Sequence, residues 1–189
     1  MSKDNTKRDA ESLSTSTFND RATTPLALRG AVEPGGVDVS FKGTVQEIDA
    51  QVHRINPNFS WRDFKPSPGR FSKSPRKRSP SKVLCHVQGL PPAPRAALES
   101  SRDWLNALAA ELSVDAQRCT KVSCVAGAAV WFCNDNLGWI QEVSLTLATH
   151  VDAILDQEGC GTAGNSSLVQ GQSFDSDNYN IIVNGDECA

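Results

Sequence analysis

The side chains with the clearest chemistry are the cysteines, because two thiols can be oxidised to a disulfide. The chain has six, all in its second half: Cys85, Cys119, Cys124, Cys133, Cys160 and Cys188. An even number at high density is typical of small exported domains, whose limited apolar cores are held together by disulfides. We therefore predict that all six form structural disulfides in an oxidising compartment. The alternative is six buried free thiols in a cytosolic protein.

The pairing of the cysteines is open, because six cysteines allow about fifteen connectivities. Cys119 and Cys124 belong to one expected strand and are too far apart along it to join each other. The remaining connectivities are equally compatible with the sequence.

The cysteines can also be considered as metal ligands or nucleophiles, and their spacing fits neither role. Structural zinc sites need paired ligands at short spacing. Cys119, Cys124 and Cys133, with His86 as the nearest imidazole, contain no second tight pair. Cys85 and His86 are neighbours in an expected strand, so their side chains point to opposite faces and cannot share a proton. We predict no zinc site and no cysteine nucleophile.

Two other strings resemble ligand-binding motifs but do not fit the structural context that those motifs need. Gly159–Gly164 matches GxGxxG, but a dinucleotide loop leaves a strand and opens a helix, whereas this string follows a helix and enters a polar loop. Asp175 and Asp177 begin like a calcium loop, but Tyr179 and Asp186 at its later positions do not fit a helix–loop–helix site. We expect a solvated turn at Asp175, and no catalytic residue, metal or cofactor in the chain.

The elements that position these residues are predicted from apolar periodicity after Val83. The order is strand, helix, strand, strand, helix, strand, strand, which predicts an α+β fold. Specifically, we expect a two-layer α/β sandwich with two helices on one face of an antiparallel or mixed sheet. Ser144 is the expected N-cap of the second helix, and His150 is expected on its surface or flank. The expected segments are Val83–Gly89, Arg95–Leu112, a strand pair over Cys119–Cys133 turning near Ala126–Ala128, Val143–Gln157, Leu168–Phe174 and Tyr179–Val183.

The first part of the chain differs from the second in charge and pattern. Residues 1–82 carry 15 Lys/Arg and 9 Asp/Glu, a balance of +6, and residues 83–189 carry 4 and 13, a balance of −9. Residues 1–35 have a composition typical of disorder, and Val37–Ile55 alternates but shows no core. Pro57–Lys82 combines Ser-Pro steps with basic residues, which favours an extended linker. We predict that residues 1–82 are a disordered, basic, Ser/Pro-rich arm or propeptide, and that residues 83–189 are an acidic, cysteine-rich domain.

Export normally requires a leader, and the first residues do not provide one. Met1–Asp20 lacks the charged stretch and apolar run of a signal peptide, and no window is apolar enough for a membrane span. This conflicts with the cysteine argument. Unconventional export, a leader preceding this sequence, or reduced cysteines would each remove the conflict, and we favour the second explanation.

Three strings of the sequence together carry a family resemblance: CTKVSCVAGAAVWFCNDN, VQGQSFDSDNYNIIV and the closing Cys188. They resemble small cysteine-rich secreted proteins of filamentous fungi. Many of those proteins are effector candidates with an α/β sandwich similar to virus-encoded killer toxins. The resemblance covers about residues 83–188 and implies secretion, structural disulfides and a role directed at a host or a competitor, without enzyme activity. The absent leader and the long basic arm depart from the family pattern.

The dibasic step Lys77-Arg78 fits this context. Kexin-type proteases of the secretory pathway cut after such pairs, and a cut after Arg78 would release Ser79–Ala189, which is nearly the whole predicted domain. The alternative is a solvated basic linker.

We therefore expect a secreted, non-enzymatic, effector- or toxin-like fungal protein with an unidentified host or competitor target. Its contacts are expected on the loops Asn134–Trp139 and Gly161–Ser167; Trp139 is expected to be buried beside the second helix, and an exposed position would make it a contact anchor. The alternative is a nuclear or cytoplasmic protein that binds nucleic acid or an acidic partner. Its binding element would be the basic arm Lys73–Lys82, regulated by phosphorylation, because the acidic domain itself would repel nucleic acid.

Overall fold

The computed structural model describes residues 22–61, 65–66, 80–87, 89–108, 110–162 and 165–188. Within these residues the architecture is mixed α/β, with three helices, a mixed central sheet and three disulfides. The helices are α1 Val45–Ile55, α2 Arg95–Leu108 and α3 Ser144–Asp156. No helix in the described part of the chain has the length and apolar character needed to cross a membrane.

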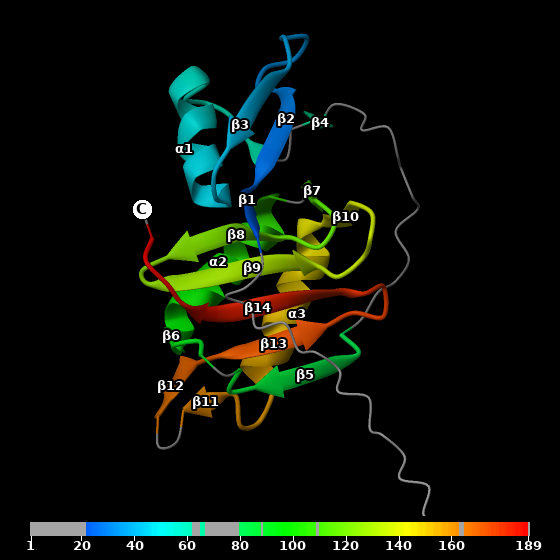
Figure 1. Cartoon of the computed structure of the whole chain (residues 1–189). Coiled ribbons are helices and arrows are strands. Elements are labelled where there is room, and N and C mark those ends of the chain that lie inside the picture. Colours follow the sequence, from blue (N-terminus) through cyan, green and yellow to red (C-terminus); the bar gives the residue numbers. More distant parts are fainter. Residues whose placement is uncertain are drawn as a thin grey trace, which may run out of the picture.

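A six-stranded sheet lies at the centre of the molecule, in the order β1-β8-β9-β14-β13-β5 (Figure 1). All neighbouring strands pair antiparallel except β1, which pairs parallel with β8. The strands are β1 Thr23–Pro25, β5 Lys82–Cys85, β8 Cys119–Val125, β9 Ala128–Asn134, β13 Gly171–Phe174 and β14 Tyr179–Gly185. Five of these six strands overlap segments that the sequence predicted to be extended, and β1 was not predicted.

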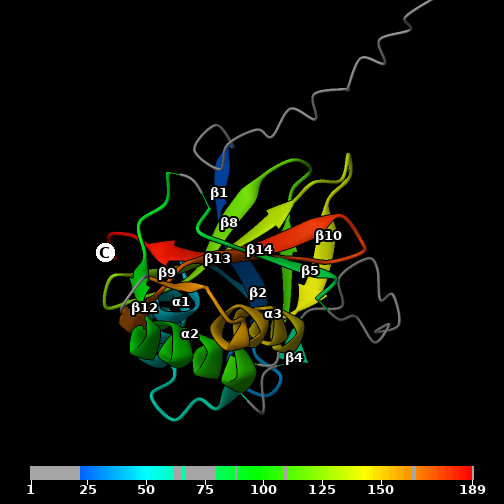
Figure 2. The same cartoon turned by 90° about the horizontal axis from the view of Figure 1, so that it is seen from below.

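Helices α2 and α3 pack against each other on one face of this sheet (Figure 2). α2 buries Leu98 and Leu105, and α3 buries Leu147 and Ile154, at the spacing expected for one apolar side of a helix. The opposite face of the sheet carries a smaller buried cluster, which contains Cys119, Ala129, Trp131, Cys133 and Ile182. Both faces of β9 and β14 are therefore covered, and nearly every residue of these strands is buried.

The antiparallel pair predicted over Cys119–Cys133 is confirmed as the hairpin of β8 and β9. Val125 pairs with Ala128, which leaves Ala126 and Gly127 as a two-residue turn. Both turn residues have positive φ angles, 44° and 80°. This is the pattern of a type I′ turn, whose twist matches that of the strands it joins.

Several short strands were absent from the sequence prediction. The predicted helix Arg95–Leu112 ends at Leu108, and Leu112 lies instead in β7 (Glu111–Val114), which pairs with β10 (Ile140–Val143). A second small sheet contains β6 (Ala93–Pro94), β11 (Gly161–Thr162) and β12 (Asn165–Val169). The predicted N-cap of α3 is also wrong. Val143 holds that position, and Ser144 Oγ accepts a hydrogen bond from the Ala110 N–H over 3.2 Å.

Residues 22–61 form ordered structure, so the prediction of a disordered arm up to residue 82 is wrong for this segment. We call residues 22–61 the N-terminal unit and residues 80–188 the disulfide domain. After β1, the unit contains the hairpin of β2 (Ala27–Ala31) and β3 (Val39–Lys42), followed by α1. The two-residue strand β4 (Lys65–Pro66) also pairs with β2. Figure 1 shows the hairpin and α1 beside the β8 edge of the central sheet.

The physical reason for this order is a shared core. Leu26, Phe41, Val45 and Ile48 are buried in the same hydrophobic cluster as the helices and strands of the disulfide domain. α1 begins with a capping box, in which Thr44 Oγ1 accepts from the Glu47 N–H and the Glu47 carboxylate accepts from the Thr44 N–H. The core that the sequence analysis did not find for this segment is supplied by the other half of the chain.

Candidate functional site

All six cysteines form disulfides, as predicted. Cys85–Cys160 ties β5 to the segment between α3 and β11, and Cys119–Cys133 joins β8 to β9. Cys124–Cys188 attaches the segment after β14 to β8. Cys119 and Cys124 have different partners, which agrees with the expectation that they do not join each other. Three disulfides are compatible with an extracellular protein.

A set of buried polar side chains lies between α3 and the central sheet. We call Glu142, His150, Ser173, Asp175 and Tyr179 the buried polar cluster; they come from β10, α3, the end of β13 and β14. His150 Nδ1 is 2.8 Å from Ser173 Oγ, and His150 Nε2 is 3.4 Å from Asp175 Oδ2. The Tyr179 hydroxyl is 3.3 Å from Glu142 Oε2 and 3.5 Å from His150 Nε2. Each polar group is thereby placed opposite another one inside the core.

Two sequence expectations are wrong at this cluster. His150 was expected on the surface or flank of its helix, but it is fully buried because its position on α3 faces the sheet. Asp175 was expected in a solvated turn, but its side chain is buried and points inward. One carboxylate oxygen accepts from the Asp177 N–H (2.9 Å), and the other faces His150. Asp175 therefore holds the turn before β14 with one carboxylate oxygen and faces the His150 ring with the other.

Burial controls the protonation of this cluster. Burial lowers the pKa of His150 from its ordinary value, and the neighbouring Asp175 carboxylate opposes part of that effect. Burial raises the pKa of Tyr179 above its ordinary value, and the Glu142 and Asp175 carboxylates add to this rise. Ser173, His150 and Asp175 have the residue types of a nucleophile, base and acid, but the Ser173 hydroxyl is in the core and presents no reacting atom at the surface.

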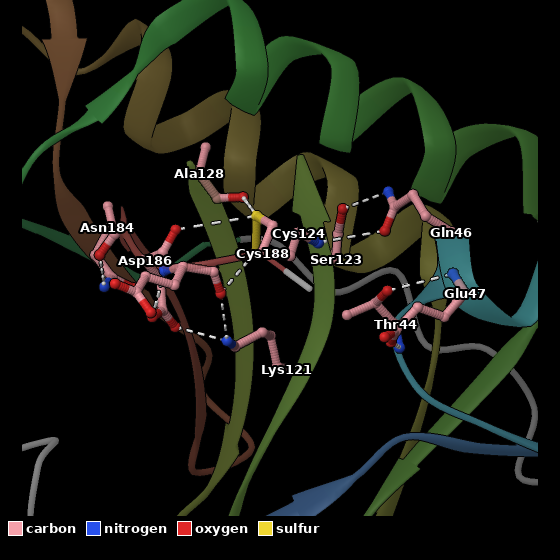
Figure 3. Close-up of a disulfide and its surroundings, with 12 residues drawn as sticks. Thr44, Gln46, Glu47, Lys121, Ser123, Cys124, Ala128, Asn184, Asp186 and Cys188 are labelled. Atoms are coloured by element: carbon pink, nitrogen blue, oxygen red, sulfur yellow. Dashed lines mark hydrogen bonds and ion pairs between the residues drawn. A yellow bond between two sulfur atoms is a disulfide. The ribbon is translucent and has the colours of Figure 1, made fainter. Parts of the chain in front are cut away.

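A second constellation lies where the N-terminal unit meets β8 (Figure 3). We call it the junction site. The Gln46 side chain, in the first turn of α1, donates from Nε2 to Ser123 Oγ over 2.7 Å. Its Oε1 accepts from the backbone N–H of Cys124 over 3.2 Å. One amide group thus contacts two consecutive residues of β8, directly beside the Cys124–Cys188 disulfide.

The segment after β14 completes the junction site. Lys121 forms an ion pair with Asp186 over 2.8 Å, and its Nζ lies 5.0 Å from the centre of the Trp131 ring. Together with the Cys124–Cys188 bond, these contacts hold residues 186–188 along β8. A cavity of about 270 Å³ opens here between the two parts of the chain. Its walls include Leu26, Gly43, Thr44, Glu47, Lys121, Cys124, Glu187 and Cys188.

The loop between β9 and β10 exposes two large apolar side chains. Leu137 is 86% exposed and Trp139 is 48% exposed, so the expectation that Trp139 is buried is wrong. We call this pair the apolar tip. Its base is held by two asparagines: Asn134 Nδ2 donates to the Gly138 carbonyl (2.8 Å), and Asn136 Nδ2 donates to the Asp177 carbonyl (2.9 Å). The tip therefore projects from an ordered base.

No family model, curated protein or solved structure matches this chain. Among the residues that the structure describes, no group of three or more His, Cys, Asp or Glu side chains could hold a metal ion. The predicted processing residues Lys77 and Arg78 and the basic stretch of the arm before Pro80 lie outside the described residues. Most of the second predicted contact loop is extended instead, because Gly161–Thr162 and Asn165–Val169 pair as β11 and β12.

Sequence reasoning identified the cysteines but missed Gln46, Glu142 and Ser173. These residues are far apart in sequence and meet only through tertiary packing. One signal was available in advance: Tyr179 is the only tyrosine of the chain and begins the apolar run of β14. A tyrosine in such a position needs a buried partner for its hydroxyl.

Proposed function

We propose that this protein is a secreted, non-enzymatic binding protein of the effector or toxin type, with the disulfide domain as its working part. The observation that carries the proposal is the set of three disulfides in a domain whose His, Asp and Tyr cluster is buried. Structural disulfides persist outside reducing compartments. A buried cluster supports the domain and leaves its surface for recognition. The family resemblance points in the same direction.

The apolar tip is the contact surface that this function would use. Tryptophan and other large apolar residues supply much of the binding energy at protein interfaces, and Leu137 and Trp139 are exposed together on one loop. The asparagine contacts at the base of the loop reduce the conformational entropy that the loop would lose on binding. The balance of −9 over residues 83–189 favours a target with a basic surface.

The dibasic step is the place where the precursor would be processed. Lys77-Arg78 lies between the N-terminal unit and the disulfide domain, so a cut there interrupts neither of them. The proposed function therefore includes cleavage after Arg78 in the secretory pathway.

The first test separates this function from the intracellular alternative. Protein recovered from the culture medium of an expressing fungus should have the mass of the fully oxidised chain and gain six hydrogens on reduction, as expected for three disulfides. Its N-terminal sequence should begin at Ser79 or show both products of a cut after Arg78. A protein retained in the cell with free thiols would overturn the proposal.

The second test concerns the contact surface. Purified protein is applied to competitor fungal cells and infiltrated into plant leaves, and growth inhibition and cell death are measured over a concentration series. The double variant Leu137→Ala/Trp139→Ala should need at least about tenfold more protein for the same effect.

Val37→Ala is the matched control, because Val37 is 82% exposed but lies in the N-terminal unit, away from the loop. It should act like the wild type. An effect of the double variant equal to that of the wild type removes the tip from the proposal, and an inactive wild type in both assays contradicts the effector or toxin role.

A further inference from the structure

The N-terminal unit occupies the edge of the central sheet that would otherwise be free. β1 pairs in parallel with β8 through Thr23, Thr24 and Pro25, opposite Cys119, Thr120 and Lys121. The Cys119 N–H donates to the Ala22 carbonyl over 3.2 Å, and the Thr24 and Thr120 hydroxyls are 3.2 Å apart. An open edge strand presents unpaired backbone groups that attract other strands. β1 satisfies that need for the first part of β8.

Gln46 extends the same pairing along β8. The register of β8 shifts between Lys121 and Ser123, where its pairing with β1 has ended. From that point the Gln46 amide donates to Ser123 Oγ and accepts from the Cys124 N–H, as a peptide group of a paired strand would accept (Figure 3). The edge of β8 is thus covered first by strand β1, opposite Cys119–Lys121, and then by the Gln46 amide at Ser123 and Cys124.

Apolar contacts also cross the boundary between the N-terminal unit and the disulfide domain. α1 packs against both α2 and β8, and β2 packs against β7. Leu26, Phe41 and Ile48 join a single hydrophobic cluster with residues of the disulfide domain such as Leu112 and Val122. A segment of about 40 residues without disulfides does not bury enough surface to fold by itself. The unit therefore depends on the domain for its folded structure.

We propose that the N-terminal unit is a permanent, non-covalently bound subunit, so that cleavage after Arg78 yields a two-chain protein instead of a free domain. The cleavage step rests on the proposed function. The contacts described above all lie outside residues 67–79, so a cut in that segment removes none of them. All six cysteines lie in the disulfide domain and pair within it, so the association of the two chains is non-covalent.

The experiment uses the full chain with a site for a sequence-specific protease inserted between Ser74 and Pro75. The oxidised protein is cut in native buffer and passed through a size-exclusion column at decreasing concentrations. Both fragments should elute together into the nanomolar range and separate only in denaturant. Fragments that elute separately in native buffer would overturn the proposal.

The variant Gln46→Ala tests the interface itself. It leaves the buried Ser123 hydroxyl and the Cys124 N–H without their partner, so the cut protein should dissociate at about tenfold higher concentration than the wild type. Gln51→Ala is the matched control, because the Gln51 side chain bonds only to carbonyls within the unit, those of Lys42 and Glu47. Equal dissociation of the two variants would count against the interface described here.

This test is independent of natural processing. If the inserted site is cut and the fragments remain together, while secreted wild-type protein is never cut after Arg78, the proposed cleavage fails and the subunit interface stands. If the fragments separate, the interface proposal fails even where natural cleavage occurs.

Discussion

His150 illustrates how a single side chain couples the fold to pH. Its ring is enclosed by Ser173, Asp175 and Tyr179, with Glu142 on the far side of the Tyr179 hydroxyl. Burial lowers its pKa below the ordinary value of 6.5. The unfolded chain therefore binds a proton that the folded chain excludes, and the free energy of unfolding should decrease as the pH falls below 6.5.

The variant His150→Gln tests this coupling. It should lose about 1–3 kcal/mol at about pH 8, because its amide replaces the histidine contacts imperfectly. Its stability should then change less than that of the wild type as the pH is lowered to about 5. Urea unfolding at several pH values gives both quantities.

His53→Gln is the matched control for this prediction, since His53 lies on α1 with a side chain that is 39% exposed. It removes a histidine outside the buried polar cluster and leaves the contacts of His150 in place. A His150→Gln protein with the same pH dependence as the wild type would show that His150 is not the responsible group.

Tyr179 gives a second prediction at the scale of one residue, because any tyrosinate absorbance of this chain must come from it. Burial, reinforced by the Glu142 and Asp175 carboxylates, raises its pKa above the ordinary value of 10, and it is the only tyrosine of the chain. An acid whose pKa is raised by folding ionises more readily in the unfolded chain, so stability should be lost as the pH rises above 10. In an alkaline titration, the tyrosinate absorbance should appear together with loss of the folded circular dichroism spectrum. Tyrosinate formation at about pH 10 in a protein that is still folded would contradict this account.

At the scale of elements, the β8–β9 turn offers a stabilising substitution. Ala126 has a φ of 44°, a conformation that alanine adopts at a cost, whereas asparagine tolerates it. Ala126→Asn creates the Asn-Gly pair preferred in type I′ turns and should increase the free energy of unfolding by about 0.5–1 kcal/mol. Gly127→Ala should do the reverse, because its φ of 80° strains any residue with a Cβ. Thermal unfolding of the two variants should therefore shift in opposite directions.

The elements that the sequence predicted well have long, regular apolar patterns. The β8–β9 hairpin, α2, α3 and β14 all belong to this class, because their buried residues recur at the period of a strand or a helix. β7 and β10 were missed because each is a short strand beside a helix: β7 begins shortly after α2, and β10 leads directly into α3. Leu112 shows the consequence. Its spacing continues the pattern of α2, although the chain has already turned into β7.

At the scale of the whole molecule, the average charge of residues 1–82 hides a segment that is ordered by packing on the disulfide domain. Residues 22–61 carry 3 Lys/Arg and 4 Asp/Glu, so all of the basic excess of residues 1–82 lies on either side of them. The apolar residues of this segment are too few to form a core alone, but they complete the core of the disulfide domain. Periodicity is a property of one segment at a time, so the pattern around Ile48 does not indicate that it shares a core with Leu112.

The candidate sites show the same limit. The sequence predicted that the cysteines form disulfides, because their even number and high density indicate it. Which cysteine joins which depends on the order of strands in the sheet. Cys124 meets Cys188 because β8 lies at the β1 side of β9 and the chain returns to it after β14. The buried polar cluster depends on four separate elements packing together, β10, α3, β13 and β14, and no local spacing encodes it.

The position of β14 has a consequence for the order of events during synthesis. In chain order β14 is made after the other strands of the central sheet, yet it lies between β9 and β13. Until it emerges from the ribosome, no strand joins the pair β8–β9 to the strands β5 and β13. The two halves of the sheet therefore remain unjoined until then, and His150 on α3 lacks its contact with Tyr179. The central sheet can therefore be completed only after its last strand has been synthesised.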